Sequence, residues 1–171
     1  FHGDDFAFLY DPDTPAHLGQ IASSNSIGRA DGHGDLRGLT EKLDYLSDLG
    51  VDCLWLLPIY PSPLKDDGYD IADYYGILPE YGSVEEFRAL LDAAHARGIK
   101  VIVDYVMNHC SNQHPWFVAS SQNDPAYRDY FRWSPSNPGH TGPWGQDVWH
   151  WHSSGWYYGL FWGGMPDLNY E

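Results

Sequence analysis

The sequence is poor in basic residues. It has 9 lysines and arginines against 24 aspartates and glutamates, a net charge of −15. Nucleic acids and anionic membrane surfaces attract positive charge, so this balance argues against both as partners. The sequence also lacks a signal-like segment and any apolar run long enough to span a bilayer. We therefore expect a cytoplasmic protein with no nucleic acid and no membrane among its partners.

Cysteine is also scarce, since the sequence contains only Cys53 and Cys110. Two cysteines do not make a disulfide framework. Cys53 lies early in one predicted strand and Cys110 follows the end of the next, so the two positions are far apart along the strand axis. We expect both to be free thiols.

Aromatic residues, in contrast, are abundant at 16% of the chain, with 8 Trp and 13 Tyr. Their rings offer broad apolar faces with a polar handle, which suits the C–H faces and hydroxyls of sugars. Many fall in residues 111–164, a stretch also rich in Pro, Ser, Asn and Gly, where only residues 125–133 suggest a helix. We expect an irregular subdomain with a compact core of tryptophans, and direct ligand stacking by one or two of them is the alternative. The tryptophans are Trp144, Trp149, Trp151, Trp156 and Trp162.

Residues 36–58 show a helical pattern followed by a strand pattern. Leucines recur at helical spacing from Leu36 to Leu49, and Gly50 supplies a residue that can end the helix in the left-handed conformation. The apolar run at 51–58 then predicts a buried strand.

A second helix and strand follow a long loop at residues 59–82, and loops of this length are usually functional. Ser83 and Glu86 form the pattern of a capping box, and the apolar positions after it predict a helix that ends at Gly98. Residues 100–106 predict a second buried strand. Strand, helix and strand in this order indicate an α/β fold with a parallel sheet.

Polar side chains gather at the end of the second strand, where Asp104, Asn108 and His109 follow an apolar run. In α/β barrels the carboxyl ends of the strands carry the chemistry, because the side chains meet there in a shared opening. These three residues are therefore candidates for binding a ligand. The alternative is that they only hydrogen-bond the following loop.

Four stretches of the sequence resemble motifs of the α-amylase superfamily of glycoside hydrolases, in the same order and at similar spacing. Residues 104–109 read D-Y-V-M-N-H, and residues 66–74 read D-D-G-Y-D-I-A-D-Y. Residues 34–38 are similar to the entry to the first barrel helix of the family, and residues 165–169 to a motif near the end of its inserted B domain. The resemblance covers about residues 31–171, and it implies part of a (β/α)₈ TIM barrel with an inserted, irregular B domain.

The resemblance also implies a domain organisation. Residues 1–30 stay unassigned, residues 31–109 correspond to the N-terminal part of the catalytic barrel, and residues 110–171 to the B domain and its return to the barrel. A barrel of this kind needs about 250 residues. We therefore expect the nucleophilic aspartate and the acid/base glutamate beyond Glu171, and no activity from the chain as given.

The family pattern implies roles for five residues. Asp66 resembles the carboxylate that accepts hydrogen bonds from a bound glucose, Tyr69 the ring that stacks on this glucose, and His109 the imidazole that donates to its 6-hydroxyl. Asp104 is expected to orient an arginine near the nucleophile, with Asn108 in a supporting position. Asp70 is a further carboxylate expected at the same opening.

The implied activity is the hydrolysis or transfer of α-glucosidic bonds in malto-oligosaccharides or α-glucans by a retaining enzyme of α-amylase or α-glucosidase type. Residues 61–70 most resemble trehalose synthases and their α-glucosidase relatives, so a maltose glucosyltransferase that forms trehalose is the alternative. Met165, however, resembles a group that includes α-amylases. A non-catalytic, α-amylase-like binding subunit is the alternative of another class.

No cofactor is expected to be required. Many relatives bind calcium in the loop before the first helix through the pattern D-x-N-x-D-G-x-G-D. Here Ile27 and Arg29 occupy the first two ligand positions, and calcium prefers six to eight oxygen ligands. Asp31, the His33 carbonyl and Asp35 remain, so calcium at these three residues is the alternative to a metal-free protein.

Overall fold

The computed structural model describes residues 35–171, which divide into two compact units. The first unit contains residues 35–61 and 75–104, and the second contains residues 62–74 and 105–171. Each unit is therefore built from two separate stretches of the chain. The domain boundaries expected at residues 30 and 109 stay predictions.

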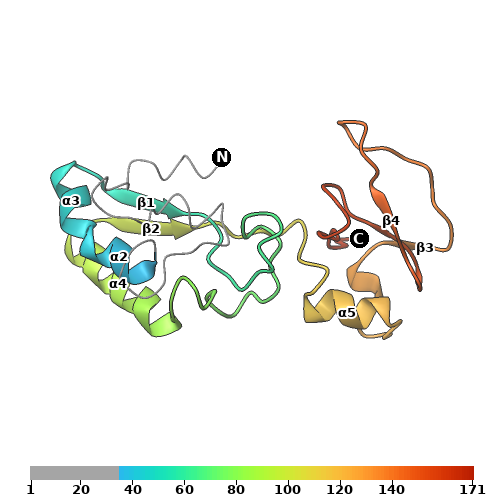
Figure 1. Cartoon of the computed structure of the whole chain (residues 1–171), viewed down its shortest axis with the longest axis horizontal. Coiled ribbons are helices and arrows are strands. Elements are labelled where there is room, and N and C mark those ends of the chain that lie inside the picture. Colours follow the sequence, from blue (N-terminus) through green and yellow to red (C-terminus); the bar gives the residue numbers. More distant parts are fainter. Residues whose placement is uncertain (1–34) are drawn as a thin grey trace. The chain divides into compact units, whose positions relative to one another are not determined.

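A parallel pair of strands forms the centre of the first unit (Figure 1). Strand β1 spans Cys53–Leu56 and strand β2 spans Lys100–Val103, with Leu54 opposite Val101. Both strands are shorter than the predicted ranges. They pair in parallel and are connected in sequence by a helix, which confirms the predicted strand–helix–strand unit. Asp104 comes directly after β2, and its backbone N–H donates to the carbonyl of Leu56 at 2.9 Å.

The two faces of this strand pair differ in exposure. Leu54 and Leu56 are buried on one face, whereas Trp55 and Ile102 are 46% and 53% exposed. The expectation of strands buried on both faces is therefore wrong for the described part of the chain. The indole of Trp55 donates a hydrogen bond to a carboxylate oxygen of Asp104 at 3.2 Å.

The predicted helix at residues 36–49 is instead two short helices, α2 at Leu36–Glu41 and α3 at Leu43–Asp48. The break lies at Lys42, whose φ and ψ are −94° and 0°. The hydroxyl of Thr40 donates to the carbonyl of Leu36 at 2.7 Å, and such bonds back to the preceding turn often bend helices. The predicted left-handed end is confirmed, since Gly50 has a φ of 83°. The buried leucines are Leu36, Leu39, Leu43 and Leu46.

Helix α4, at Val84–Ala96, has the predicted capping box. The hydroxyl of Ser83 accepts from the backbone N–H of Glu86 at 3.1 Å, and the Glu86 carboxylate accepts from the backbone N–H of Ser83 at 2.8 Å. Two N–H groups at the helix start are thereby satisfied. Leu90 and Ala94 are buried, and α4 packs against α2 and β2.

We expect Ser83→Ala to lower the free energy of unfolding by about 1 kcal/mol, because it removes the side-chain half of this capping box. The measurement is urea unfolding of the complete protein. Ser47→Ala is the matched control, since Ser47 lies exposed within α3. Equal changes for the two variants would contradict the assigned cap.

The second unit contains short elements that the sequence pattern did not reveal. Its three strands form an antiparallel sheet in the order β3-β5-β4. The helix suggested at residues 125–133 is only one 3₁₀ turn, and the α-helix of this unit lies earlier. The elements are α5 (Pro115–Ser121), η2 (Arg128–Tyr130), β3 (Trp133–Ser134), β4 (Trp149–His152) and β5 (Gly155–Tyr158).

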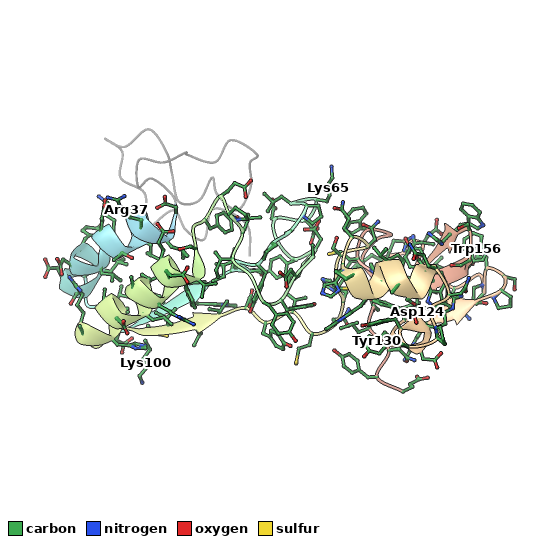
Figure 2. The ribbon with its side chains drawn as sticks, turned by 90° about the horizontal axis from the view of Figure 1, so that it is seen from below. Arg37, Lys65, Lys100, Asp124, Tyr130 and Trp156 are labelled. Atoms are coloured by element: carbon green, nitrogen blue, oxygen red, sulfur yellow. The ribbon has the colours of Figure 1, made fainter. Side chains whose placement is uncertain are left out.

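The core of the second unit is aromatic, but it is not made of the five predicted tryptophans. Phe117 on α5 packs against Phe131 and Tyr157, with ring centroids 5.1 and 4.8 Å away. Because rings from α5 and β5 fill the interior, the later tryptophans lie at or near the surface, and Trp144 and Trp151 are 71% and 69% exposed. Figure 2 shows the side chains that crowd this unit.

The two cysteines are free, as predicted. Cys53 is exposed on β1, whereas Cys110 is fully buried beside the aromatic core. Burial raises the pKa of the Cys110 thiol far above its usual range, so this side chain behaves as a small apolar group.

Candidate active site

The loop that carries Asp66 and Tyr69 is organised by a buried carboxylate. Asp70 is 1% exposed. One of its carboxylate oxygens accepts from the Ser62 hydroxyl at 2.6 Å and from the Asp66 backbone N–H at 3.3 Å, and the other accepts from the Lys65 backbone N–H at 3.0 Å. The Lys65 side chain points away from the loop (Figure 2). Asp70 therefore holds the loop together, and the expectation that it faces the opening is wrong.

Backbone geometry fixes the turn between Asp66 and Tyr69. Asp67 and Gly68 have positive φ values of 50° and 99°, in the region that aspartate tolerates and glycine adopts freely. The backbone N–H of Tyr69 donates to the Asp66 carbonyl at 2.9 Å. The turn thus fixes the backbone positions of Asp66 and Tyr69.

Asp66 has an altered acidity. Its partial burial raises the pKa of its carboxyl group, and the negative charge of Asp70 raises it further. The positive charge that His109 can carry acts in the opposite direction, so the carboxylate and the imidazole interact electrostatically. Asp66 can accept hydrogen bonds from a ligand once it is ionised.

His109 is buried and has an unused nitrogen. The residue is 4% exposed, and its Nε2 has no hydrogen-bond partner among residues 35–171. Burial lowers the pKa of the imidazole, opposed by the carboxylate of Asp167, the Tyr69 backbone and the carboxylates of Asp66 and Asp70. A lowered pKa favours the neutral ring near pH 7, with one nitrogen donating and the other accepting.

Asn108 and Asp167 determine which nitrogen of His109 donates. The amide nitrogen of Asn108 lies 3.3 Å from Nδ1 of His109, and the Asn108 side chain lowers the pKa of the Asp167 carboxyl group. An amide nitrogen can only donate, so Nδ1 is the acceptor of this pair. Nδ1 then accepts, which leaves the proton of the neutral ring on Nε2, the nitrogen without a partner.

Asp167 and Tyr74 support this arrangement, and sequence reasoning assigned them no role. Asp167 pairs with His109 in an antiparallel bridge and accepts from the Leu160 backbone N–H at 3.0 Å. Burial raises the pKa of Asp167. The Tyr74 hydroxyl lies 2.8 Å from the His109 carbonyl and 2.9 Å from the Val106 carbonyl. Tyr74 lies in the motif at residues 66–74, and Asp167 lies in the motif at residues 165–169. The sequence therefore singled out both segments, but it did not reveal the contacts that these two side chains make.

The structure brings Asp66, Tyr69, Asn108 and His109 into one unit. Asp104 belongs to the other unit, where its side chain accepts from Trp55. The substrate-binding and supporting roles expected for these five residues stay predictions.

The calcium alternative also stays a prediction. Asp31 and His33 lie outside the described residues. Asp35 is the N-cap of α2, and its carboxylate accepts from the Gly38 backbone N–H at 2.7 Å. Within residues 35–171, no group of three or more His, Cys, Asp or Glu side chains is placed to hold a metal ion. Within the same range, no helix is both long and apolar enough to cross a membrane.

Comparison with known proteins gives a consistent result. The profile of the alpha amylase catalytic domain matches residues 22–171. The chain is 51% identical over 160 residues to a trehalose synthase of Pimelobacter sp., covering 83% of this chain and 26% of that protein. It is 49% identical over 140 residues to alpha-amylase 3 of Dictyoglomus thermophilum, covering 81% of this chain and 27% of that protein.

Solved structures agree with this relation. The crystal structure of an alpha-amylase from H. orenii matches with a TM-score of 0.75 and 50% identity, covering 84% of this chain and 31% of that one. Trehalose-6-phosphate hydrolase of Bacillus licheniformis matches with a TM-score of 0.77 and 43% identity, covering 83% and 27%. The chain therefore spans about a quarter to a third of the length of these relatives.

Proposed function

Because the chain belongs to the α-amylase family of glycoside hydrolases, we propose that the complete protein hydrolyses or transfers α-glucosidic bonds in malto-oligosaccharides or α-glucans. The relation also supports a (β/α)₈ barrel that includes β1 and β2, with residues 110–171 as its inserted B domain. The described elements support the start of such a barrel, since β1, α4 and β2 form one parallel strand–helix–strand unit.

The match of residues 22–171 to the alpha amylase catalytic domain carries this proposal, and the buried His109, whose Nε2 lacks a hydrogen-bond partner among residues 35–171, supports it. A buried N–H without an acceptor is costly, so such groups in native structures commonly have a ligand or water as partner. Asp66, an acceptor, and Tyr69, an aromatic ring, come from the turn that interacts with the same imidazole. A donor, an acceptor and a ring together match the hydroxyls and the C–H face of a glucose unit.

In the proposed site each group has a defined task. His109 Nε2 donates to the 6-hydroxyl of the bound glucose, Asp66 accepts from its hydroxyls, and Tyr69 stacks on its ring. Asp104 orients an arginine elsewhere in the barrel. These groups position the sugar, and contacts that strengthen in the transition state raise the rate. A retaining mechanism also needs a nucleophilic carboxylate and an acid/base carboxyl group about 5–5.5 Å apart.

Trehalose synthesis from maltose is the second candidate. The identity of 51% to a trehalose synthase supports it, as does the resemblance of residues 61–70 to that group. Both reactions begin by transferring a glucosyl unit to a carboxylate, and they differ in whether water or released glucose accepts it.

Incubation of the complete protein with maltose, maltotriose, isomaltose and starch tests the proposal. We expect glucose or shortened oligomers if water is the acceptor, and trehalose from maltose if glucose is the acceptor. No product from any of the four substrates would overturn the proposal, and binding of maltotriose without turnover would then favour a non-catalytic binding subunit.

A further inference from the structure

The turn between Asp66 and Tyr69 contains a dipeptide that the hydrogen bonds of the loop leave free. Both ends of the turn are held, since the Tyr69 backbone N–H donates to the Asp66 carbonyl at 2.9 Å and the Asp66 backbone N–H donates to Asp70 at 3.3 Å. Asp67 and Gly68 lie between these ends, and neither makes a hydrogen bond to the described part of the chain. The side chain of Asp67 is also exposed to solvent.

Glycine after aspartate favours a reaction of the aspartate side chain with its own backbone. The nitrogen of the following residue attacks the side-chain carboxyl carbon and closes a five-membered ring. A side chain on that residue hinders the attack, and Gly68 has no Cβ atom. The φ of 50° at Asp67 lies in the left-handed region, which costs free energy for any residue with a Cβ atom. Rotation of Asp67 out of this conformation therefore breaks no hydrogen bond of its own and relieves strain.

We propose that Asp67 and Gly68 form a site of spontaneous isomerisation, at which the peptide bond rearranges to isoaspartate and the protein loses activity with time. The Gly68 nitrogen bonds to Cγ of Asp67, and the amide hydrogen leaves with the hydroxyl of the protonated carboxyl group as water, which gives a succinimide. Water then adds to the main-chain carbonyl of Asp67 and breaks its bond to the Gly68 nitrogen. One water leaves and one enters, so the reaction needs no other reactant.

The rearrangement changes the length of the turn. The main chain then runs through Cβ and Cγ of Asp67 instead of through its carbonyl carbon, which adds one carbon atom and about 1.5 Å. A displacement of about 1 Å in a substrate-positioning group is enough to cost 100-fold in rate. Asp66 and Tyr69 flank the inserted atom, and both are assigned to the same glucose. The loss of activity therefore rests on the proposed function, whereas the isomerisation does not.

Peptide analysis of the ageing protein tests the proposal. The complete protein is incubated at neutral pH below its melting temperature, and samples are digested with trypsin. Residues 66–88 form one tryptic peptide, because Lys65 precedes it and Arg88 is its first basic residue. The other aspartyl–glycine pair of the sequence, at residues 31–32, falls in a different peptide. Chromatography separates the isoaspartyl form, and labelling by an isoaspartate-specific carboxyl methyltransferase identifies it. We expect the residual activity on maltotriose to equal the fraction of the 66–88 peptide that is unmodified.

Two variants of Asp67 should change the rate in opposite directions. Asp67→Gly removes the carboxyl group, and glycine adopts the native φ freely, so this variant should keep its starting activity through the incubation. Asp67→Asn should be fully active when fresh and should lose activity faster than the wild type. The uncharged amide of asparagine accepts the attack of the nitrogen more readily than a carboxylate does, and it releases ammonia in place of water.

The outcomes distinguish this inference from the proposed function. Loss of activity at the same rate in Asp67→Gly and the wild type would overturn the inference while the glycosidase assignment stands. A protein that still lacks isoaspartate at residue 67 after a synthetic peptide of residues 64–72 has reached its final ratio of the two forms would overturn it as well. A fresh protein inert towards maltotriose would remove the proposed function and the predicted loss of activity, and the peptide analysis would then decide the isomerisation by itself.

Discussion

Replacement of Asp70 by alanine is expected to lower kcat/KM for maltotriose at least about 100-fold in the complete protein and to destabilise it. The carboxylate of Asp70 accepts three hydrogen bonds inside the loop, from Ser62, Lys65 and Asp66. Alanine removes three partly buried hydrogen bonds to a charged acceptor, and such bonds contribute about 1.5–3 kcal/mol each. Displacement of a substrate-positioning residue by about 1 Å is enough to cost 100-fold in rate.

Asp67→Asn is the matched control for this change. Asp67 lies in the same turn, but its side chain is exposed, and asparagine tolerates its φ of 50°. We expect this variant to retain the activity and the melting temperature of the wild type. Near-normal kcat/KM for Asp70→Ala, in a variant whose folding is verified by circular dichroism, would show that Asp70 does not organise the loop.

His109→Ala is expected to weaken transition-state binding by about 1–3 kcal/mol without abolishing turnover. A buried donor that only positions the sugar contributes about this much. The test compares kcat/KM of the wild type and the variant with α-glucosyl fluoride, which probes the first glucose alone. Complete loss of turnover in a folded variant would mean that His109 takes part in the chemical step.

Asn108 gives this prediction a second test. Because its amide nitrogen lies against Nδ1 of His109, Asn108 acts by fixing the ring so that Nε2 carries the proton. We therefore expect Asn108→Ala to lower kcat/KM on its own and to have almost no effect in a protein that already contains His109→Ala. Additive losses in the double variant would show that Asn108 acts independently of the imidazole.

The sequence predicted the parallel part of the fold well, because that part depends on local signals. The capping box at Ser83 and the glycines after each helix are determined by residues a few positions apart. The break at Lys42 was not predictable in this way, since it accompanies a side chain that bonds back to the helix rather than a change in hydrophobic pattern. Helix α5 was missed because it has only seven residues and its N-cap is His114 rather than a common N-cap residue.

The sequence predicted which residues form the candidate site, but not the contacts that join them. The resemblance of residues 66–74 and 104–109 to motifs of the family identified Asp66, Tyr69 and His109 as candidates, and the structure places all three in one unit. Three aspartates of the matched motifs looked alike in sequence, yet Asp70 is internal to its loop and Asp104 is bonded to Trp55. The link from Asp167 through Asn108 to His109 joins residues about 60 positions apart, which no local pattern reveals.

The interleaving of the two units has a consequence for the order in which the protein folds. Residues 62–74 are synthesised before residues 75–104, but their partners in the second unit follow only at 105–171. The Ser111 backbone N–H, which donates to the Ile71 carbonyl at 2.8 Å, closes a loop that contains all of α4 and β2. Closing a long loop costs entropy before its contacts form, which slows folding. During synthesis on the ribosome, the segment that carries Asp66 and Tyr69 therefore lacks its contacts with residues 105–171 until the chain beyond β2 has emerged.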